Sequence, residues 1–292
     1  MKILLTGGSG FIGRNLVGYL GARHEVLAPA RTELELLDED AVRRYFTANR
    51  IDAVVHAAVR PGHRNAKDPS GQLAINTRMF FNLVRNKDRF KKMVVLSSGL
   101  VYDMRHYLPR MKEGYFDAHV PADEGGFSKY LIAKYSERTE YITELRAFGV
   151  FGAYEDYAIR FISNAICKAL FGLPITIRQD RLFDYIFIDD LMSVIGHFLE
   201  DGSGVGAYNV CAGRPVALKA LAEKVREISG KDLPIVIARP GMGVEYSGDN
   251  SRLKKEMPGF ECAPLDASLQ KLYSWYAANK GSIDRESLLV DK

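Results

Sequence analysis

The chain alternates short apolar runs with longer amphipathic stretches. The short runs predict buried strands at 2–6, 25–28, 53–58, 93–98 and 144–148. The stretches between them predict helices at 11–21, 39–49, 70–87 and 128–140. Strands and helices that alternate at this spacing are typical of a parallel sheet with helices on both faces. We therefore expect an α/β, doubly wound fold.

The later part of the chain continues the pattern less regularly. Residues 183–200 predict one more apolar strand and a helix that Asp189 or Asp190 can cap. The segments that follow predict a smaller α/β lobe. We expect the sheet domain to comprise 1–151 and to be rejoined by about 183–212. The substrate-binding lobe then comprises 152–182 and 213–292.

Glycines crowd the junction between the first strand and the first helix. Gly7, Gly10 and Gly13 form G-x-x-G-x-x-G, and Gly8 with the last two forms G-x-G-x-x-G. A strand precedes them and a helix starting near Phe11 follows, which is the context of a dinucleotide-binding loop. Glycines let the backbone approach a pyrophosphate, whose charge meets the free N–H groups of the helix start. The sequence therefore predicts a Rossmann domain that binds a dinucleotide.

The end of the second strand bears on the choice of dinucleotide. It carries no acidic residue for the adenosine ribose, and Arg31 follows just beyond it. A guanidinium pairs well with a 2′-phosphate, which favours NADP, whereas Glu33 and Glu35 keep NAD open. The residues expected to bind the cofactor are Gly7, Gly10, Phe11, Ile12, Gly13, Arg31, Glu35, Leu36, Ala57, Ala58, Asn76 and Lys134.

Three residues predict the chemistry. Tyr130 and Lys134 are four positions apart, so on a helix both lie on one face. An ammonium beside a phenol lowers the phenol's pKa, and Tyr130 could then exchange a proton with a substrate oxygen while hydride moves. Ser98 follows a strand at the edge of the sheet where ligands bind, and its hydroxyl can bond the same oxygen. A packed tyrosine, a surface lysine and a capping serine are the structural alternatives.

Composition narrows the classes of protein. Of 292 residues, 47% are hydrophobic and 26% charged, and no apolar run is long enough to span a membrane. The start lacks a signal-peptide pattern, so we expect a cytoplasmic protein. The net charge of +4 arises from 40 basic residues interspersed with 36 acidic ones, which does not favour nucleic acid. The three cysteines and six histidines show no metal-ligand spacing, so we expect no metal site.

Taken as a set, these motifs resemble the extended short-chain dehydrogenase/reductases, in particular the nucleotide-sugar epimerase/dehydratase family. The likeness runs from Lys2 to about Lys280. It includes GGSGFIG, HAA at 56–58, Asn76 with Asn82, LSSGLVY, KYLIAK, LRAFGVFG, FDYIFIDDL, ARPG and SGDNSRLKKEMPGF. The resemblance implies a catalytic triad of Ser98, Tyr130 and Lys134, with Lys134 also holding the nicotinamide ribose. It further implies that Arg239 contacts the diphosphate of a nucleotide-sugar, and that the protein is a homodimer.

Departures from the family pattern narrow the reaction. Gly99 and Leu100 stand where the dehydratases carry Asp-Glu, and they cannot transfer protons. Leu100 also replaces the cysteine of the fucose synthase group, which argues against 3,5-epimerisation. Hydride transfer at a sugar carbonyl remains, and we expect reduction of a 4-keto sugar by NADPH. A 4-epimerase that recycles its cofactor and a catalytically silent NADP-binding regulator are the alternatives.

Two further segments are candidates for contact with the substrate. The insert at 103–127 is rich in Arg, His, Lys and Tyr and is either a lid over an anionic ligand or a solvated loop. After the GVFG turn, Tyr154, Tyr157, Arg160 and Asn164 can form a substrate wall or pack against the helix face. The residues expected to bind substrate are Ser98, Tyr130, Arg160, Asn164 and Arg239.

Overall fold

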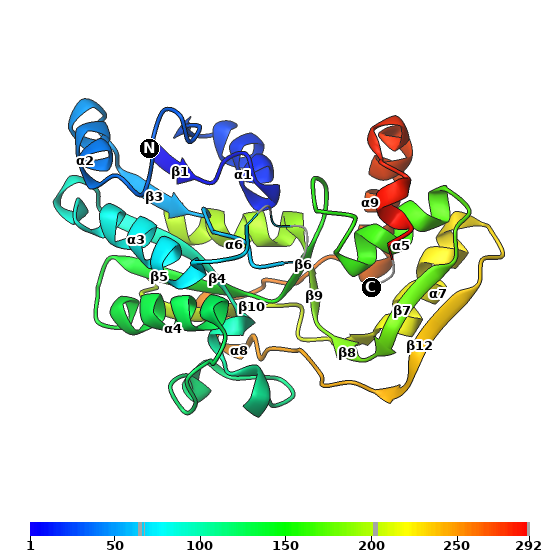
Figure 1. Cartoon of the computed structure of the whole chain (residues 1–292). Helices are drawn as coiled ribbons and strands as arrows, with labels where there is room; N and C mark the ends of the chain where they lie inside the picture. Colours follow the sequence, from blue (N-terminus) through cyan, green and yellow to red (C-terminus); the bar gives the residue numbers. More distant parts are fainter. Residues whose placement is uncertain (64–65, 67, 201–203, 291–292) are drawn as a thin grey trace.

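The structure, a computed structural model, describes residues 1–63, 66, 68–200 and 204–290. Its main sheet has six parallel strands in the order β10-β5-β4-β3-β1-β2 (Figure 1). The order reverses beside β1, as in a doubly wound sheet, so the expected fold class is confirmed. The strands are β1 (Lys2–Thr6), β2 (Glu25–Leu27), β3 (Ala53–His56), β4 (Lys92–Ser98), β5 (Ile142–Ala147) and β10 (Gly206–Val210).

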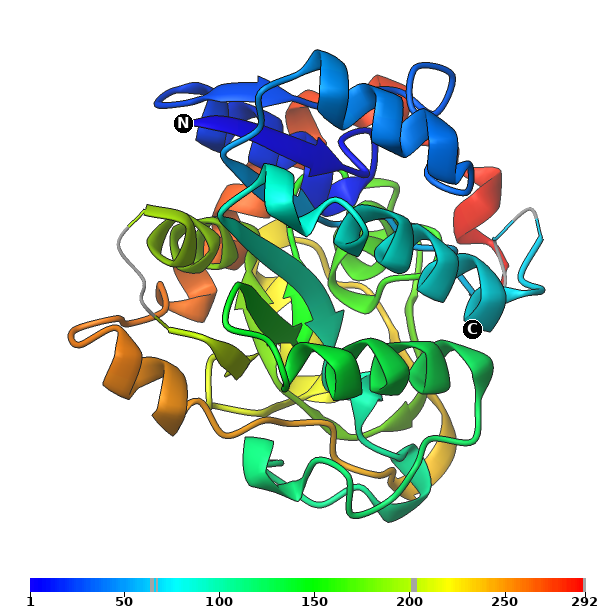
Figure 2. The same cartoon turned by 90° about the vertical axis from the view of Figure 1, so that its left-hand side faces the viewer.

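Helices cover both faces of this sheet, because its central strands are apolar on both sides. The first face packs with α2 (Glu39–Ala48), α3 (Gln72–Val84) and α4 (Glu124–Ser136), and its core includes Phe46, Phe80 and Ile132. Figure 2 shows these three helices stacked in front of the strands. The second face packs with α1 (Phe11–Gly21) and α6 (Ile188–Glu200), through Leu16 and Leu191 among others.

A smaller lobe lies beside the sheet, at the right of Figure 1. A parallel ribbon of β7 and β12 packs there with α5, α7 and α9. Two short pairings, β6 with β9 and β8 with β11, lie outside the main sheet. The helices and strands outside the main sheet domain are β6 (Gly149–Phe151), α5 (Phe161–Leu170), β7 (Ile175–Asp180), β8 (Leu182–Phe183), β9 (Tyr185–Phe187), β11 (Val216–Ala217), α7 (Leu218–Ser229), β12 (Ile235–Met242) and α9 (Leu265–Ala278), whereas α8 (Ser251–Glu256) contacts β10 of the main sheet.

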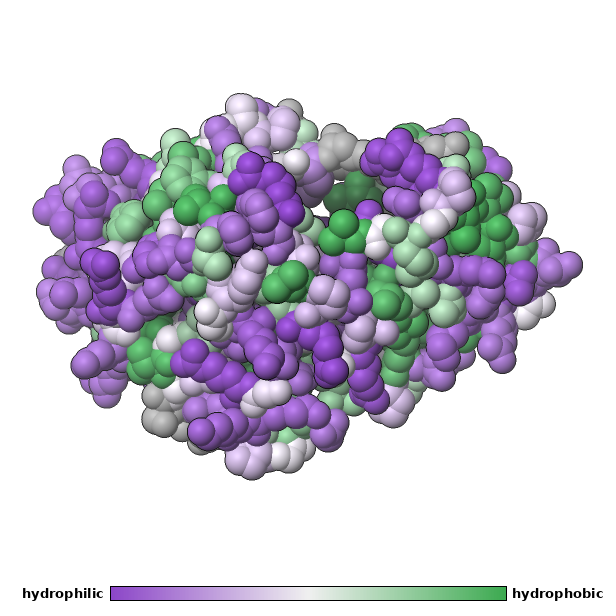
Figure 3. Space-filling view, turned by 90° about the horizontal axis from the view of Figure 1, so that it is seen from below, coloured by the Kyte–Doolittle hydropathy of each residue, from purple (hydrophilic) through white to green (hydrophobic). Residues whose placement is uncertain are grey.

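The view from below shows a mostly hydrophilic surface, with hydrophobic side chains gathered toward the smaller lobe (Figure 3). Val236, Met242 and Val244 contribute exposed apolar surface in and just after β12. No helix in the described ranges is both long and apolar enough to cross a membrane. Short 3-10 helices fill the connections: η1 (Lys87–Arg89), η2 (Gly99–Val101), η3 (Met104–His106), η4 (Glu113–Tyr115), η5 (Lys280–Ser282) and η6 (Glu286–Leu288).

Two elements differ from the sequence-based expectation. The strand expected in 183–187 pairs β9 with β6 and does not join the main sheet. The helix expected at 128–140 begins at Glu124 instead, because the Asp123 carboxylate accepts a hydrogen bond from the Gly126 amide (2.7 Å) and caps it. The two glycines of the first turn, Gly125 and Gly126, had hidden this start. The earlier start adds a turn ahead of Ser128 and Lys129.

Candidate active site

The glycine loop after β1 is shaped for close approach. Gly7 has a φ of +76°, and a Cβ there would stand 2.7 Å from the backbone nitrogen of Ala58. A Cβ on Gly13 would stand 2.0 Å from the Gly7 carbonyl oxygen, so the first turn of α1 lies directly against the loop. Gly10 caps α1 in extended conformation, without a side chain over the helix start. Any larger residue would fill the cradle, so the loop fits a dinucleotide pyrophosphate at the helix N-terminus.

The adenosine side of the expected site begins after β2. Arg31 and Glu35 are paired there, with 2.6 Å between Nε of Arg31 and Oε2 of Glu35. The guanidinium is largely exposed and its partner is also solvent-accessible, so a phosphate can compete for it. Leu36 is buried, and its carbonyl accepts a hydrogen bond from Asn82 of α3 (2.8 Å). These contacts leave Arg31 available to a 2′-phosphate.

A small cavity opens at the carboxyl ends of β3 and β4. Its polar lining comes from His56 of β3, Asn76 of α3, Ser97 of β4, and Ser128 and Lys129 of α4. Ala58 also lines it, at the loop that touches Gly7. The cavity and the glycine loop therefore both border on Ala58, at the edge where doubly wound sheets bind ligands.

Hydrogen bonds hold the walls of this cavity. Asn76 accepts from the Arg60 amide (2.7 Å) and donates to the Ser128 hydroxyl (3.3 Å), which ties α3 to α4. The Thr6 hydroxyl bonds Nδ1 of His56 (2.8 Å). The hydroxyl of Ser97 is buried and has no hydrogen-bond partner among the described residues. A buried unpaired hydroxyl costs free energy, so it is a polar group available to a ligand.

Burial shifts the pKa values of the two basic side chains that line the cavity, Lys129 and His56. Burial lowers the pKa of the Lys129 ammonium, and the carboxylate of Glu144 opposes that shift only in part. Burial, together with the charge of Lys129, lowers the pKa of His56 to about 4. His56 is therefore neutral at pH 7, and the Lys129 amine is the second basic group that lines the cavity.

Ser98 lies at the last position of β4, opposite Ala147 of β5. Its hydroxyl accepts a 3.3 Å hydrogen bond from the Leu100 amide and caps the short helix η2. The side chain stays partly accessible. Ser98 is thus at the sheet edge that the sequence predicts, beside the cavity-lining Ser97.

Tyr130 and Lys134 lie on a different side of α4 from Lys129. Both contact Asp117 of the insert: the Tyr130 hydroxyl donates to one carboxylate oxygen, and the Lys134 amine lies 2.8 Å from the other. The hydrogen bond to Asp117 and partial burial raise the pKa of Tyr130. Lys134 does act to lower that pKa, as expected, but the hydrogen bond to Asp117 and partial burial outweigh it, so the net shift is upward. The catalytic assignment of the pair itself stays a prediction.

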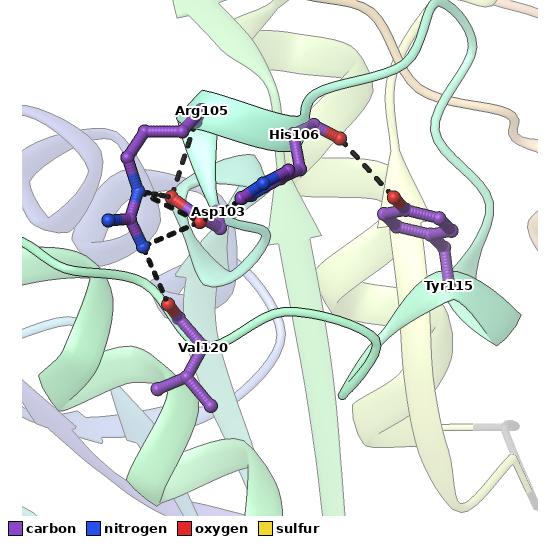
Figure 4. Close-up of polar contacts among 5 residues, drawn as sticks. All are labelled: Asp103, Arg105, His106, Tyr115 and Val120. Atoms are coloured by element: carbon purple, nitrogen blue, oxygen red, sulfur yellow. Dashed lines mark hydrogen bonds and ion pairs between the residues drawn. The ribbon is translucent and has the colours of Figure 1, made fainter.

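The insert packs on α4 and on the end of the sheet. Asp103 is buried and accepts hydrogen bonds from Arg105 and from Nδ1 of His106, which hold its pKa well below the usual range (Figure 4). Arg105 also reaches the Val120 carbonyl, and the Tyr115 hydroxyl reaches the His106 carbonyl (Figure 4). The basic residues of this segment are thus used partly to order the insert itself.

The residues expected to bind substrate fall in different surroundings. Arg160 is exposed at the start of α5, close enough to Tyr185 and Tyr246 to affect their pKa values. Asn164 is buried, and its amide donates to the Tyr157 carbonyl (2.9 Å), so it packs within the lobe. Arg239 lies exposed on β12, opposite Gln179. Of the three, Asn164 thus contacts another candidate for the substrate wall, Tyr157.

Lys129 is the residue that the sequence-based reasoning missed. The spacing of Tyr130 and Lys134 drew attention to one face of the helix, whereas the cavity faces the neighbouring one. The Asp123 cap could have located the start of the helix, but tertiary packing decides which of its side chains line the cavity. Metal-ligand clusters of three or more His, Cys, Asp or Glu do not occur among the described residues.

A glycine cradle between a strand and a helix, on a doubly wound sheet, defines a dinucleotide-binding protein. The family model described as the NAD dependent epimerase/dehydratase family matches residues 3–211. The chain belongs to this family.

Similar proteins are sugar-nucleotide enzymes. The chain is 29% identical over 320 residues to a dTDP-4-dehydro-6-deoxy-D-allose reductase from Streptomyces sp., covering 95% of this chain and 97% of the relative. It is 39% identical over 107 residues to a GDP-L-fucose synthase from Azorhizobium caulinodans, a match that spans 35% of this chain and 34% of that protein. Among solved structures, a UDP-glucose 4-epimerase from Thermotoga maritima superposes with a TM-score of 0.82 at 22% identity, covering 96% of this chain and 100% of the other.

Proposed function

We propose that this protein uses NADPH to reduce the keto group of a nucleotide-bound 4-keto sugar. The observation that carries the proposal is the placement of the Lys129 ammonium, the Ser97 hydroxyl and Ser98 at the same sheet edge as the glycine cradle. The similarity to a dTDP-4-dehydro-6-deoxy-D-allose reductase over nearly the whole chain supports a keto-sugar substrate. A GDP-mannoheptose C4 reductase from Campylobacter jejuni with NADP bound has the same fold, with a TM-score of 0.81 at 21% identity over 94% of this chain and 98% of the other.

The residues fit a bound dinucleotide. The cradle of Gly7, Gly10 and Gly13 would hold the pyrophosphate, and Arg31 the 2′-phosphate. Lys129 would face the nicotinamide end through the cavity. When bound, the reduced nicotinamide supplies hydride. The chain's own contribution is to orient the keto group through Ser98 and to stabilise negative charge through the Lys129 ammonium.

Two assignments of the ammonium therefore compete. The sequence favours Lys134 with Tyr130, and the geometry favours Lys129, because it is the lysine that lines the cavity. We assign Lys129. Matched substitutions of the two lysines separate these assignments.

The experiment is a cofactor assay with a panel of GDP-, dTDP- and UDP-linked 4-keto-6-deoxy sugars. We expect loss of NADPH absorbance with at least one of them and transfer of deuterium from 4-deuterated NADPH to the sugar. NADPH that binds but is never consumed would instead favour the silent regulator. Substitution of Arg31 by Ala should weaken NADPH binding more than NADH binding.

A 4-epimerase that recycles its cofactor is the second candidate. The chain is 24% identical to a UDP-glucose 4-epimerase from Bacillus subtilis over 96% of this chain and 98% of that one. Conversion of UDP-glucose without net change in cofactor would select this reading. We also propose a cytoplasmic homodimer, which light scattering on the purified protein would test.

A further inference from the structure

The glycine cradle by itself supplies little positive charge. A pyrophosphate carries a negative charge on each phosphate, whereas a helix start offers the equivalent of about half a positive charge. In the strand-loop-helix unit 2–21 the basic side chains are Lys2 and Arg14. Lys2 is paired with Glu25 at the start of β1, at the opposite end of the strand from the cradle. Arg14 is therefore the cation that this unit can place beside the pyrophosphate.

The side chain of Arg14 is bonded to the glycine loop itself. Its Nε donates a 2.9 Å hydrogen bond to the carbonyl of Ser9, the residue between Gly8 and Gly10. The side chain is exposed. Among the residues that the structure describes, its terminal guanidinium nitrogens have no hydrogen-bond partner. A guanidinium presents its N–H donors in a fixed fork, so these nitrogens are available to phosphate oxygens while Nε holds the loop.

An aromatic ring from another part of the chain supports this guanidinium. Cζ of Arg14 lies 5.5 Å from the ring centroid of Tyr154, in the loop between β6 and α5. The same ring packs edge-on against Trp275 of α9, with centroids 5.2 Å apart. The Ala153 carbonyl accepts a hydrogen bond from the Asn15 amide (3.0 Å), which fixes the loop to α1. Figure 1 shows this loop between α1 and α9.

The backbone of Tyr154 is strained. Its φ is +70°, in the left-handed region that aromatic residues rarely adopt. The residue is 46% exposed, so burial of the ring does not account for the conformation. Strained residues persist where surrounding contacts hold them, and they gather at ligand-binding sites. The side chains that contact this ring are Arg14 and Trp275.

We propose that Arg14 binds the pyrophosphate of the dinucleotide and that Tyr154 positions its guanidinium. This inference rests on the dinucleotide binding in the proposed function, but not on the reaction that follows. The terminal nitrogens of Arg14 donate to the phosphate oxygens, while the Ser9 carbonyl and the Tyr154 ring keep the guanidinium beside the cradle. Because α9 holds the loop 152–160, affinity for the cofactor depends on how the smaller lobe places that loop.

The first test compares Arg14→Gln with Arg23→Gln in the full-length protein. Arg23 is an exposed arginine just beyond the other end of α1, and its Cζ lies 5.0 Å from the Tyr19 ring, so it matches Arg14 in charge and aromatic contact. Isothermal titration calorimetry gives the dissociation constants of NADPH and NADH. We expect Arg14→Gln to raise both by the same factor of about tenfold, because both dinucleotides contain the pyrophosphate. Arg23→Gln should change both by no more than about twofold.

The pair of dinucleotides separates this role from that of Arg31, which is expected to favour NADPH alone. Unchanged binding by Arg14→Gln, or weaker binding of NADPH without weaker binding of NADH, would overturn the assignment of Arg14 and leave the proposed function standing. A wild type that binds neither dinucleotide would overturn the proposed function as well.

The second test is a double-mutant cycle between Arg14 and Tyr154. Tyr154→Phe retains the ring and should keep the NADPH dissociation constant within about twofold. Tyr154→Asn tolerates the left-handed φ but lacks the ring, so it should raise that constant about threefold. In the Arg14→Gln background, Tyr154→Asn should have no further effect, because the guanidinium that it positions is gone. No effect in the wild type, or an equal effect in both backgrounds, would overturn the positioning role.

Discussion

Two neighbouring residues of one helix meet opposite environments. Lys129 of α4 faces the cavity, where burial lowers the pKa of its ammonium. Tyr130, the next residue, faces the insert and bonds Asp117 at the protein surface. Consecutive helix positions differ by about 100° in direction, so one residue of register decides which side chain reaches the site. The comparison teaches that one helix presents its two lysines to different surroundings, Lys129 to the cavity and Lys134 to Asp117 of the insert.

The sharpest way to break this comparison is to remove each ammonium in turn. Lys129→Met should lower NADPH-dependent turnover about a thousandfold, because it removes the cation of the cavity. Lys134→Met should change turnover by no more than about threefold, because its partner Asp117 is outside the cavity. Steady-state kinetics with NADPH titrations measure both. The reverse ranking would restore the sequence-based assignment.

The buried His56 of the cavity predicts that the free energy of unfolding depends on pH. His56 has a pKa of about 4 in the folded protein against an ordinary value of 6.5. Its stabilising effect is present above pH 6.5 and is lost as pH falls toward 4, because the unfolded chain binds the proton more readily. The free energy of unfolding falls by about 3 kcal/mol over this interval.

Urea unfolding between pH 4 and 8 checks this expectation, with His56→Gln as the comparison. The variant should show a weaker dependence in that interval. Lys129→Met should also weaken it, since the charge of Lys129 contributes to the depressed pKa of His56. Equal slopes in all three proteins would contradict the electrostatic account.

The contacts of Asp117 with Tyr130 and Lys134, on the insert side of α4, should affect the protein's stability at lower pH and more weakly. Lys134 and Tyr130 lower the pKa of Asp117 from its ordinary value of 3.8. The stabilisation is therefore present above about pH 4 and disappears as pH falls through the folded-state pKa. Asp117→Asn should lower the thermal midpoint slightly at pH 7 and expose the insert to protease.

The same variant and the wild type should converge in thermal midpoint once the pH falls below the lowered, folded-state pKa of Asp117, where both side chains are neutral. A difference that persists unchanged at that pH would show that the carboxylate charge is not what holds the insert. Limited proteolysis followed by mass spectrometry locates the cleavage.

Removing the phenol hydroxyl of Tyr130, on the insert side of α4, should have the smallest effect on turnover. Tyr130→Phe should keep kcat within about twofold, because the lost hydrogen bond lies at the surface. The sequence-based hypothesis expects this variant to be inactive. The kcat of the Tyr130→Phe variant therefore decides whether the catalytic side chain of α4 is on the cavity side or on the insert side.

Much of the fold was predictable from the pattern of apolar residues. The runs at 2–6, 53–58 and 93–98 are strands of the parallel sheet, since buried parallel strands are apolar on both faces. The glycine loop was predictable for a similar reason: Gly7 and Gly13 are required by backbone contacts within one strand-loop-helix unit. The start of α4 was not, because two glycines in its first turn indicate a loop unless the Asp123 cap is recognised.

By itself, the sequence determined the α/β architecture, the dinucleotide loop and Ser98 at the strand end, because each depends on residues close together in the chain. Tertiary structure alone decided that Lys129 lines the cavity, that Asp117 engages Tyr130 and Lys134, and that Tyr107 and Tyr246 meet at Gly99. Asp117 contacts residues 13 and 17 positions further along the chain, and Tyr246 meets Gly99 across 147 positions. No local pattern encodes such distances, since they follow from how the insert and the smaller lobe pack on the sheet.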